Sequence, residues 1–277
     1  MTGSLFSSEG SADSAPRLDP LIVAGAGMAL AAVIGAQLNP VLLLIVVVAA
    51  AGVSAAGLAH GFEDSGLTAS PSLYAAGAIL FPLTAYLWQE PALTGAVAAL
   101  IFLAAVRWVL ARRSRGPVLS IGSFVLSALY VGFCSAYVVL LGRVPRGGRL
   151  ILGLALVGGL YHGGRWVGDT FLRGRSLVPH LSDTPTLPGA LLGTAGSLAG
   201  AAALLFVAYG HLWAVPALEI GLAVGLALTA GAVAWELIRP EGTPPDRSQV
   251  PGRVLVIVQG ILLGAPALFH ALRLALR

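Results

Sequence analysis

The sequence contains no lysine, only one cysteine and few charged residues of any kind. Charged side chains make up 10% of its 277 residues, whereas a soluble domain carries about 25%. So few charges cannot cover a water-facing surface, and the apolar residues, 57% of the chain, fall in long blocks. Because a run of about 18 or more apolar residues is typical of a helix that spans a bilayer, the composition predicts an all-α, polytopic integral membrane bundle.

The motifs of common soluble enzymes are absent as well. The sequence has no HExxH or CxxC metal-ligand cluster, no Walker-type glycine loop before a lysine and no nucleophile elbow. Cys134 lies inside an apolar block with no second cysteine to pair with, so we interpret it as a buried, unreactive thiol. All sixteen basic residues are arginine, and they lie in short segments between apolar blocks, which argues against a nucleic-acid partner.

Residues 1–19 are small, polar and mildly acidic, without the features of a secretory signal peptide, and are predicted to form a disordered tail. Residues 20–277 are predicted to form a single transmembrane domain. Proline, glycine and charged clusters divide it into nine predicted spans: 20–37, 40–60, 70–88, 91–111, 117–142, 149–168, 188–209, 213–238 and 253–276. Only Leu38, Asn39 and Pro40 separate the first two, so eight spans with a re-entrant hairpin are an alternative.

The arginines predict the orientation. Short cytoplasmic loops carry an excess of positive charge, and with nine spans nine arginines share the side of the N-terminus whereas five lie on the other. We therefore predict a cytoplasmic N-terminus and a location in the inner (plasma) membrane of the cell. The nine are Arg17, Arg112, Arg113, Arg115, Arg173, Arg175, Arg239, Arg247 and Arg253, and the five are Arg143, Arg146, Arg149, Arg273 and Arg277.

Ionisable side chains within the predicted spans are few, and each is a functional candidate because charge is costly in a membrane. Most lie within about one turn of a predicted end, where the side chain can reach the interface without any special role. Glu219 lies about seven residues into its span, so either the span begins later or the acid faces a cavity. The candidates are His60, Arg107, His162, Arg165, Glu219, Glu236 and His270.

Residues 160–193 differ from the rest because polar residues are dense there between two predicted spans. Glycines would let a backbone or ligand approach closely, arginines can bind phosphate through charge-assisted hydrogen bonds, and hydroxyls add further donors. An ordinary loop with cytoplasmic arginines explains the same composition equally well. The residues concerned are Gly163, Gly164, Gly168, Arg165, Arg173, Arg175, Ser182 and Thr186.

This segment matches a two-part sequence pattern of a known enzyme family. The first part is Asp-x-x-Ala-Tyr-x-x-Gly-Arg-x-x-Gly, and the second is Leu-Ala-Pro-Arg-Ile-Ser-Pro-x-Lys-Thr-x-Glu-Gly. The matching positions are Tyr161, Gly164, Arg165, Gly168, Leu177, Pro179, Ser182, Thr186 and Gly189, and Leu129, Tyr130, Val131 and Gly132 match an earlier Tyr-Val-Gly-type helix. Over residues 117–270 the chain thus resembles the phosphatidate cytidylyltransferase (CDP-diacylglycerol synthase) family, membrane enzymes that join CTP to phosphatidic acid. The resemblance implies substrate-binding roles for Tyr161, Arg165, Arg173, Arg175, Ser182, Thr186 and Gly189.

The chain departs from the family at the acids that hold the divalent metal. Val157 stands at the position of the first aspartate, and Asp183, Pro185 and Pro188 replace the proline, lysine and glutamate of the second motif. Further on, only Glu236 survives of a Gly-Asp-Leu-x-Glu helix end. In the last block the two aspartates become Val256 and Gln259. Because metal and cationic groups stabilise the charge on the phosphates, the family mechanism cannot operate with these residues.

Three hypotheses follow. The first is an active CTP:phosphatidate cytidylyltransferase that rebuilds a magnesium site from displaced acids, with Asp183 and Glu236 as catalytic candidates beside Asp169 and Asp246. The second is a non-catalytic relative, a pseudoenzyme of phospholipid metabolism, that binds membrane lipids such as phosphatidic acid and forms a homodimer or pairs with another protein. The third is a small transporter or channel whose helix breaks line a substrate path.

Overall fold

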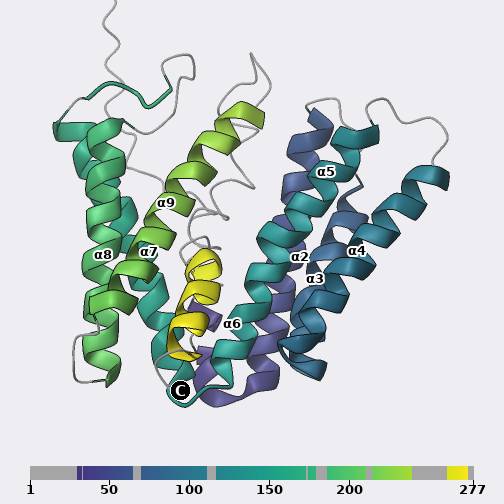
Figure 1. The fold of residues 1–277 in the computed structure, drawn as a ribbon, viewed down its shortest axis with the longest axis horizontal. Coiled ribbons are helices and arrows are strands. Elements are labelled where there is room, and N and C mark those ends of the chain that lie inside the picture. Colours follow the sequence, from purple (N-terminus) through teal and green to yellow (C-terminus); the bar gives the residue numbers. More distant parts are fainter. Residues whose placement is uncertain are drawn as a thin grey trace, which may run out of the picture.

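The computed structural model describes residues 30–32, 34–64, 70–110, 117–172, 174–178, 186–209, 214–238 and 261–273, with backbone only at 64, 108–110, 117 and 234–238 (Figure 1). These residues are almost entirely helical, and their only β-structure is an isolated bridge between Ser176 and Thr186. The helices are α2 (Pro40–Asp64), α3 (Pro71–Trp88), α4 (Pro91–Leu110), α5 (Pro117–Ser127), α6 (Cys134–Gly142), α7 (Gly147–Phe171), α8 (Leu187–Tyr209), α9 (Ala214–Ile238) and a last helix, Ile261–Arg273.

Prolines set where several of these helices begin. Pro40, Pro71, Pro91 and Pro117 are the first residues of α2 to α5, a position where the fixed φ of proline suits the helix and its missing N–H costs nothing. Asn39 caps α2, because the Val41 N–H donates to Asn39 Oδ1 at 2.8 Å. The predicted boundaries are confirmed within a few residues from α2 to α9. The first predicted span falls within the described residues only at its end.

The helices stand roughly parallel in two groups (Figure 1). One group contains α2 to α6, the other contains α7 to α9, and the last helix lies between them. The ring of Phe269 on that helix lies 5.5 Å from the ring of Tyr137 in α6. We call the lower end the one where α2, α4, α7 and α9 begin, and the upper end the one where α3, α5 and α8 begin (Figure 1).

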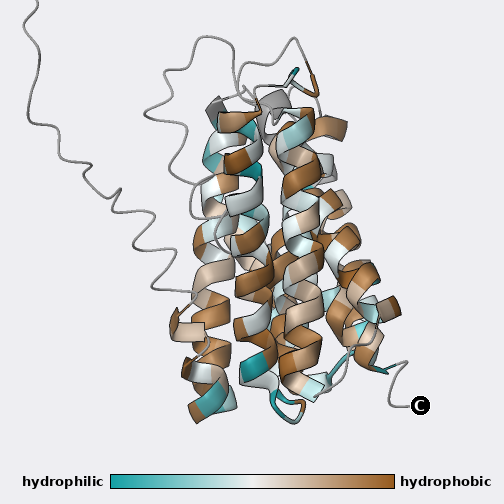
Figure 2. Ribbon diagram, turned by 90° about the vertical axis from the view of Figure 1, so that its left-hand side faces the viewer, coloured by the Kyte–Doolittle hydropathy of each residue, from teal (hydrophilic) through white to brown (hydrophobic). Residues whose placement is uncertain are grey.

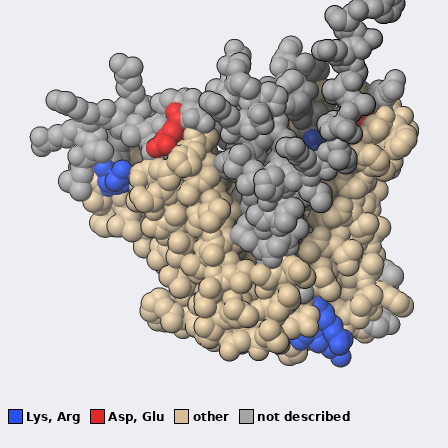
Figure 3. Space-filling view, turned by 180° about the vertical axis from the view of Figure 1, so that it is seen from behind, with Lys and Arg blue, Asp and Glu red and all other residues tan. Residues whose placement is uncertain are grey.

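The outward surface of the bundle is apolar. Ile101, Phe102 and Leu103 on α4 are between 52% and 67% exposed, and an apolar patch of this kind is unusual on a soluble monomer. Hydrophobic residues dominate the length of the helices (Figure 2), and on the face in Figure 3 charged side chains lie towards the two ends with a broad uncharged band between them. The chain is therefore a membrane-embedded helical protein.

Five of the described helices are long and apolar enough to cross a membrane. They are Pro40–Glu63, Val118–Gly142, Gly147–Phe171, Leu187–Tyr209 and Ala214–Val233, and Pro91–Arg107 and Ile261–Arg273 are shorter apolar helices. The all-helical membrane architecture agrees with the prediction, whereas five candidate spans fall short of the predicted count of nine. Glu219 lies near the start of α9 and is exposed, so its span begins only one to two turns before it.

At the lower end, two arginines in the turn between α6 and α7 bind the carboxyl ends of other helices. Arg143 donates to the carbonyl of Tyr86 in α3 at 2.6 Å and lies over the Tyr86 ring, 4.4 Å from its centroid. Arg146 donates to the carbonyl of Ala208 in α8 at 2.6 Å. The last carbonyls of a helix lack partners within the helix and carry its negative dipole end, so both contacts are favourable.

The helix that runs from α5 into α6 is interrupted by a π-helical stretch, Ala128–Phe133. Within it, Gly132 lies against α3 so closely that a Cβ would be 2.6 Å from the carbonyl oxygen of Ala78. A glycine at this point lets the two backbones touch. Helix packing thus gives this break a structural explanation that requires no substrate path.

Candidate functional site

In the second group, α7 and α8, the two helices that flank the polar segment, pack most closely against each other. A Cβ at Gly164 would lie 2.3 Å from the carbonyl oxygen of Leu192, and one at Gly168 would lie 2.5 Å from the Cα of Gly189. A Cβ at Gly196 would lie 2.4 Å from the Leu160 carbonyl oxygen. Small residues allow this approach in membranes, where no hydrophobic force drives helices together.

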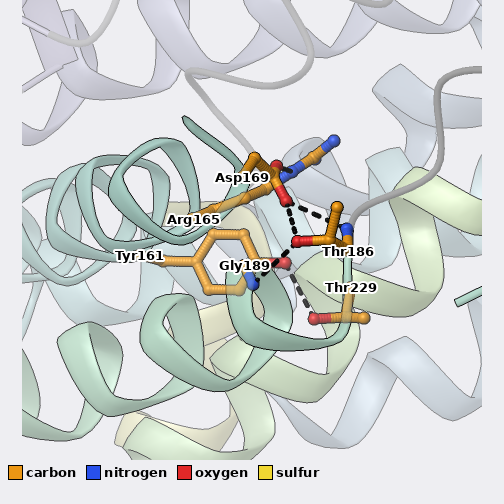
Figure 4. A network of polar contacts seen from close by, with 6 residues as sticks. All are labelled: Tyr161, Arg165, Asp169, Thr186, Gly189 and Thr229. Atoms are coloured by element: carbon orange, nitrogen blue, oxygen red, sulfur yellow. Dashed lines mark hydrogen bonds and ion pairs between the residues drawn. The ribbon is translucent and has the colours of Figure 1, made fainter. Parts of the chain in front are cut away.

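Asp169, in the last turn of α7, lies beside Thr186 and Gly189 at the start of α8 (Figure 4). Its Oδ1 accepts two hydrogen bonds from Thr186, one from the backbone N–H at 2.9 Å and one from the hydroxyl at 2.6 Å. Its Oδ2 lies 3.3 Å from Nε of Arg165, one turn earlier on α7. Both carboxylate oxygens are therefore occupied by donors from the chain itself.

Thr186 is the N-cap of α8. Its Oγ1 accepts a hydrogen bond from the Gly189 N–H at 3.1 Å while donating to Asp169, which is the geometry of an N-cap threonine. The Leu187 N–H donates to the Arg175 carbonyl at 3.0 Å, so the two ends of the α7–α8 connection are held together. We call Arg165, Asp169, Thr186 and Gly189 the Asp169 clasp.

The Asp169 carboxylate is stabilised by its position at the N-terminus of α8. The N-terminus of a helix presents free N–H groups and the positive end of the helix dipole, which makes it a ready site for an anion such as phosphate. Here the anion is Asp169, which reaches the N-terminus of α8 from the neighbouring helix. A Cβ at Gly189 would lie 2.0 Å from Asp169 Oδ1, so glycine leaves the room that the carboxylate fills.

Tyr161, two turns before Asp169 on α7, faces α9 rather than the clasp. Its side chain is fully buried, and its hydroxyl lies 2.8 Å from Oγ1 of Thr229. Because the Thr229 hydroxyl donates to the Gly225 carbonyl at 2.8 Å, Tyr161 is the donor in this pair. Tyr161 therefore ties α7 to α9 within the bundle (Figure 4).

The remaining predicted site residues are distributed as follows. The clasp brings together Arg165, Thr186 and Gly189, while Arg175 is exposed beside it at the upper end. Arg173, Ser182 and Asp183 lie outside the described residues, as does the side chain of Glu236. The sequence predicted Asp169 only as one of four displaced acids of a magnesium site, and it did not single out Thr229. The signal for the pairing of Asp169 with Arg165 was their spacing, because residues four apart on one helix lie on the same face.

The described residues do not fit a magnesium ion. Magnesium prefers several oxygen ligands in octahedral geometry, usually including carboxylates, and no group of three or more His, Cys, Asp or Glu side chains in the described part of the chain could hold a metal. Val157, at the first acid position of the family pattern, is fully buried and packs against Gly200. Asp169 is the one acid in the clasp, and its oxygens already have donors.

No protein-family model and no curated protein matches the sequence. What the chain does must therefore be inferred from the geometry of its own residues. That geometry is a closed network of protein groups at the upper end of two tightly packed helices.

Proposed function

We propose that the chain is a non-catalytic membrane protein of phospholipid metabolism, resembling phosphatidate cytidylyltransferases in its layout but not in its chemistry. One observation carries this proposal. The Asp169 carboxylate occupies the N-terminus of α8, with Oδ1 bonded to Thr186 and Oδ2 beside Arg165. Arg165 and Thr186, two of the residues that resemble the family's substrate-binding positions, are thus engaged with Asp169.

Nucleotidyl transfer requires these groups to be free. Metal ions and cations must meet the phosphates as charge develops in the transition state. In the clasp, Arg165 is partly neutralised by Asp169, and the α8 N-terminus already holds a carboxylate. A second anion placed there would be repelled by Asp169, so CTP has no favourable position at the clasp.

The decisive assay measures CDP-diacylglycerol formation. We expect the purified protein in detergent, given CTP, phosphatidic acid and magnesium, to form no more product than a preparation from cells with an empty vector. An active phosphatidate cytidylyltransferase run in parallel verifies the assay. Product above the empty-vector level would overturn the proposal. In that case Asp183→Asn and Glu236→Gln would test the two candidate acids, since loss of a metal ligand should abolish turnover.

The proposed ligand is an anionic membrane lipid such as phosphatidic acid. Arg175 is exposed at the upper end, beside the clasp. Unlike Arg165, it does not take part in the ion pair with Asp169. A basic residue at the membrane surface attracts anionic lipid by about 1 kcal/mol, which corresponds to roughly a fivefold change in binding.

Lipid retention tests this part of the proposal. We expect native mass spectrometry to find phosphatidic acid retained in preference to phosphatidylcholine. Arg175→Gln should lower phosphatidic acid retention about fivefold and leave phosphatidylcholine retention unchanged. Equal retention of the two lipids by the unaltered protein would contradict the proposal.

The proposed topology has nine spans, a cytoplasmic N-terminus and insertion in the inner membrane of the cell. In this topology the upper end is cytoplasmic. Arg149 lies in the first turn of α7 and Arg175 four residues beyond its last residue, and both are exposed. Arg175→Cys and Arg149→Cys can each be made in a Cys134→Ser background. A membrane-impermeant maleimide should label the cysteine at 149 in intact cells and the one at 175 only after permeabilisation. The reverse pattern would invert the topology.

A further inference from the structure

A cavity lies between α2, α6 and the last helix, apart from the clasp. Val46, Val47 and Ser54 line it from α2, Ser135 and Val138 from α6, and Ile261 from the last helix. The cavity is small and open on one side: its volume is about 30 Å³, on the scale on which one water molecule needs about 10–15 Å³. None of the described residues that line it is charged, and the surface they form is apolar except for the two serines.

Among the described residues, Ser54 finds no hydrogen-bond partner. Its side chain is buried, with 3% of the residue exposed, and its Oγ contacts neither a donor nor an acceptor. A serine or threonine hydroxyl within a helix can be satisfied by donating to a carbonyl one turn back, as those of Thr84 and Thr194 do here. A buried hydroxyl without a partner is costly, so the hydroxyl of Ser54 points to a partner that enters the cavity.

The two serines differ in what they can offer a ligand. Ser135 donates its hydrogen to the Gly132 carbonyl at 2.8 Å, so its oxygen can only accept a further bond. Ser54 can donate and accept, because both functions are free. A ligand hydroxyl can accept from Ser54 and donate to Ser135, whereas a carbonyl or ether oxygen can satisfy only Ser54.

The depth of Ser54 in the membrane indicates that the ligand also has an apolar part. Ser54 follows the first residue of α2 by 14 positions, about 21 Å along the helix at 1.5 Å per residue. The hydrocarbon core of a bilayer is about 30 Å thick, so Ser54 lies well inside it. We infer that the cavity binds an uncharged lipid alcohol, with its hydroxyl on Ser54 and Ser135 and its alkyl chain along Val46 and Val47 of α2.

A photoreactive alcohol tests this inference on the full chain in detergent micelles. The probe is an eight-carbon alcohol that carries a diazirine, with labelled residues mapped by mass spectrometry. We expect saturable labelling of α2 and α6 around Ser54 and Ser135. Excess octanol should compete with the probe, and excess octane should not. Labelling that does not saturate, or that is absent from these helices, would mean that the cavity holds water or nothing, and would overturn the inference.

Variants locate the hydroxyl contact. Ser54→Ala should weaken saturable labelling about three- to tenfold, the effect of one hydrogen bond, and Ala50→Phe should abolish it by filling the cavity. Ser127→Ala is the matched control, because Ser127 is equally buried and also lacks a partner but does not line the cavity. Unchanged labelling of Ser54→Ala would refute the hydroxyl contact. If that variant does not elute as a folded protein, the comparison of octanol with octane in the unaltered chain decides.

Discussion

Replacing Gly164 with alanine should lower the melting temperature of the protein by roughly 6–12 °C, which corresponds to about 3 kcal/mol. The new methyl group would lie 2.3 Å from the carbonyl oxygen of Leu192 and 2.8 Å from its carbon. Both are backbone atoms, so no side-chain rotation can relieve the contact. The two helices would have to separate, and separation would also loosen the neighbouring contacts at Gly168 and Gly193. Thermal unfolding in detergent measures the effect.

The adjacent glycine provides the matched control. A Cβ at Gly163 would have no atom within 4 Å, and alanine is favoured over glycine in a helix by up to about 1 kcal/mol. We therefore expect Gly163→Ala to leave the melting temperature unchanged or slightly raised. If the two variants melted at the same temperature, the close packing of α7 on α8 would not be what stabilises this pair.

Asp169→Ala should destabilise the protein by about 2–4 kcal/mol, because it removes two hydrogen bonds to a charged acceptor. The variant leaves the Thr186 N–H without its partner and Arg165 without its counter-ion. Asp169→Asn should cost about half as much, since an amide oxygen can still accept from Thr186 but carries no charge. Unfolding by heat in detergent measures both variants.

Two controls distinguish a loss of stability caused by breaking the clasp from one caused by removing any acidic charge. Glu63→Gln alters an exposed acid whose partner is His60 at 3.4 Å, and a change in such a surface pair should stay within about 0.5 kcal/mol. Acetate or sulfate should partly restore the stability of Asp169→Ala by occupying the vacated N-terminus of α8. The absence of any loss in Asp169→Ala would show that the carboxylate is dispensable there.

Much of the helical framework was accessible from the sequence because proline and composition act locally. Pro40, Pro71, Pro91 and Pro117 each mark the first residue of a helix, since the ring constrains the backbone whatever surrounds it. The limits of α8 and α9 were predicted to within one residue for the same kind of reason: charged and proline-containing segments flank long apolar runs. These signals do not depend on which helix packs against which.

The partners of individual side chains were harder to predict because they depend on distant parts of the chain. Tyr161 resembles a substrate-binding residue in its motif, yet its hydroxyl binds Thr229, which lies 68 positions away. The π-helical stretch arises where Gly132 meets Ala78 of α3. Neither contact leaves a trace in the local sequence, because apolar residues on every side of a membrane helix hide which face is buried.

The candidate site was predicted in part. The motif comparison selected Arg165, Thr186 and Gly189, and these three do lie together. It could not reveal that Asp169 joins them, because the first part of the family pattern ends at Gly168 and so gives the residue no role. The substrate-binding assignments stay predictions, since a residue pattern does not determine whether its polar groups face a ligand or one another.

The two arginine contacts at the lower end bear on how the molecule can move. Arg143 ties the turn before α7 to α3, and Arg146 ties it to α8, so one short turn fastens both helix groups at the same end. Any relative motion of the groups must then pivot about that turn and be largest at the opposite end. We expect the membrane leaflet on the Arg143 side to meet a nearly rigid base, while lipids in the other leaflet meet a bundle that can splay.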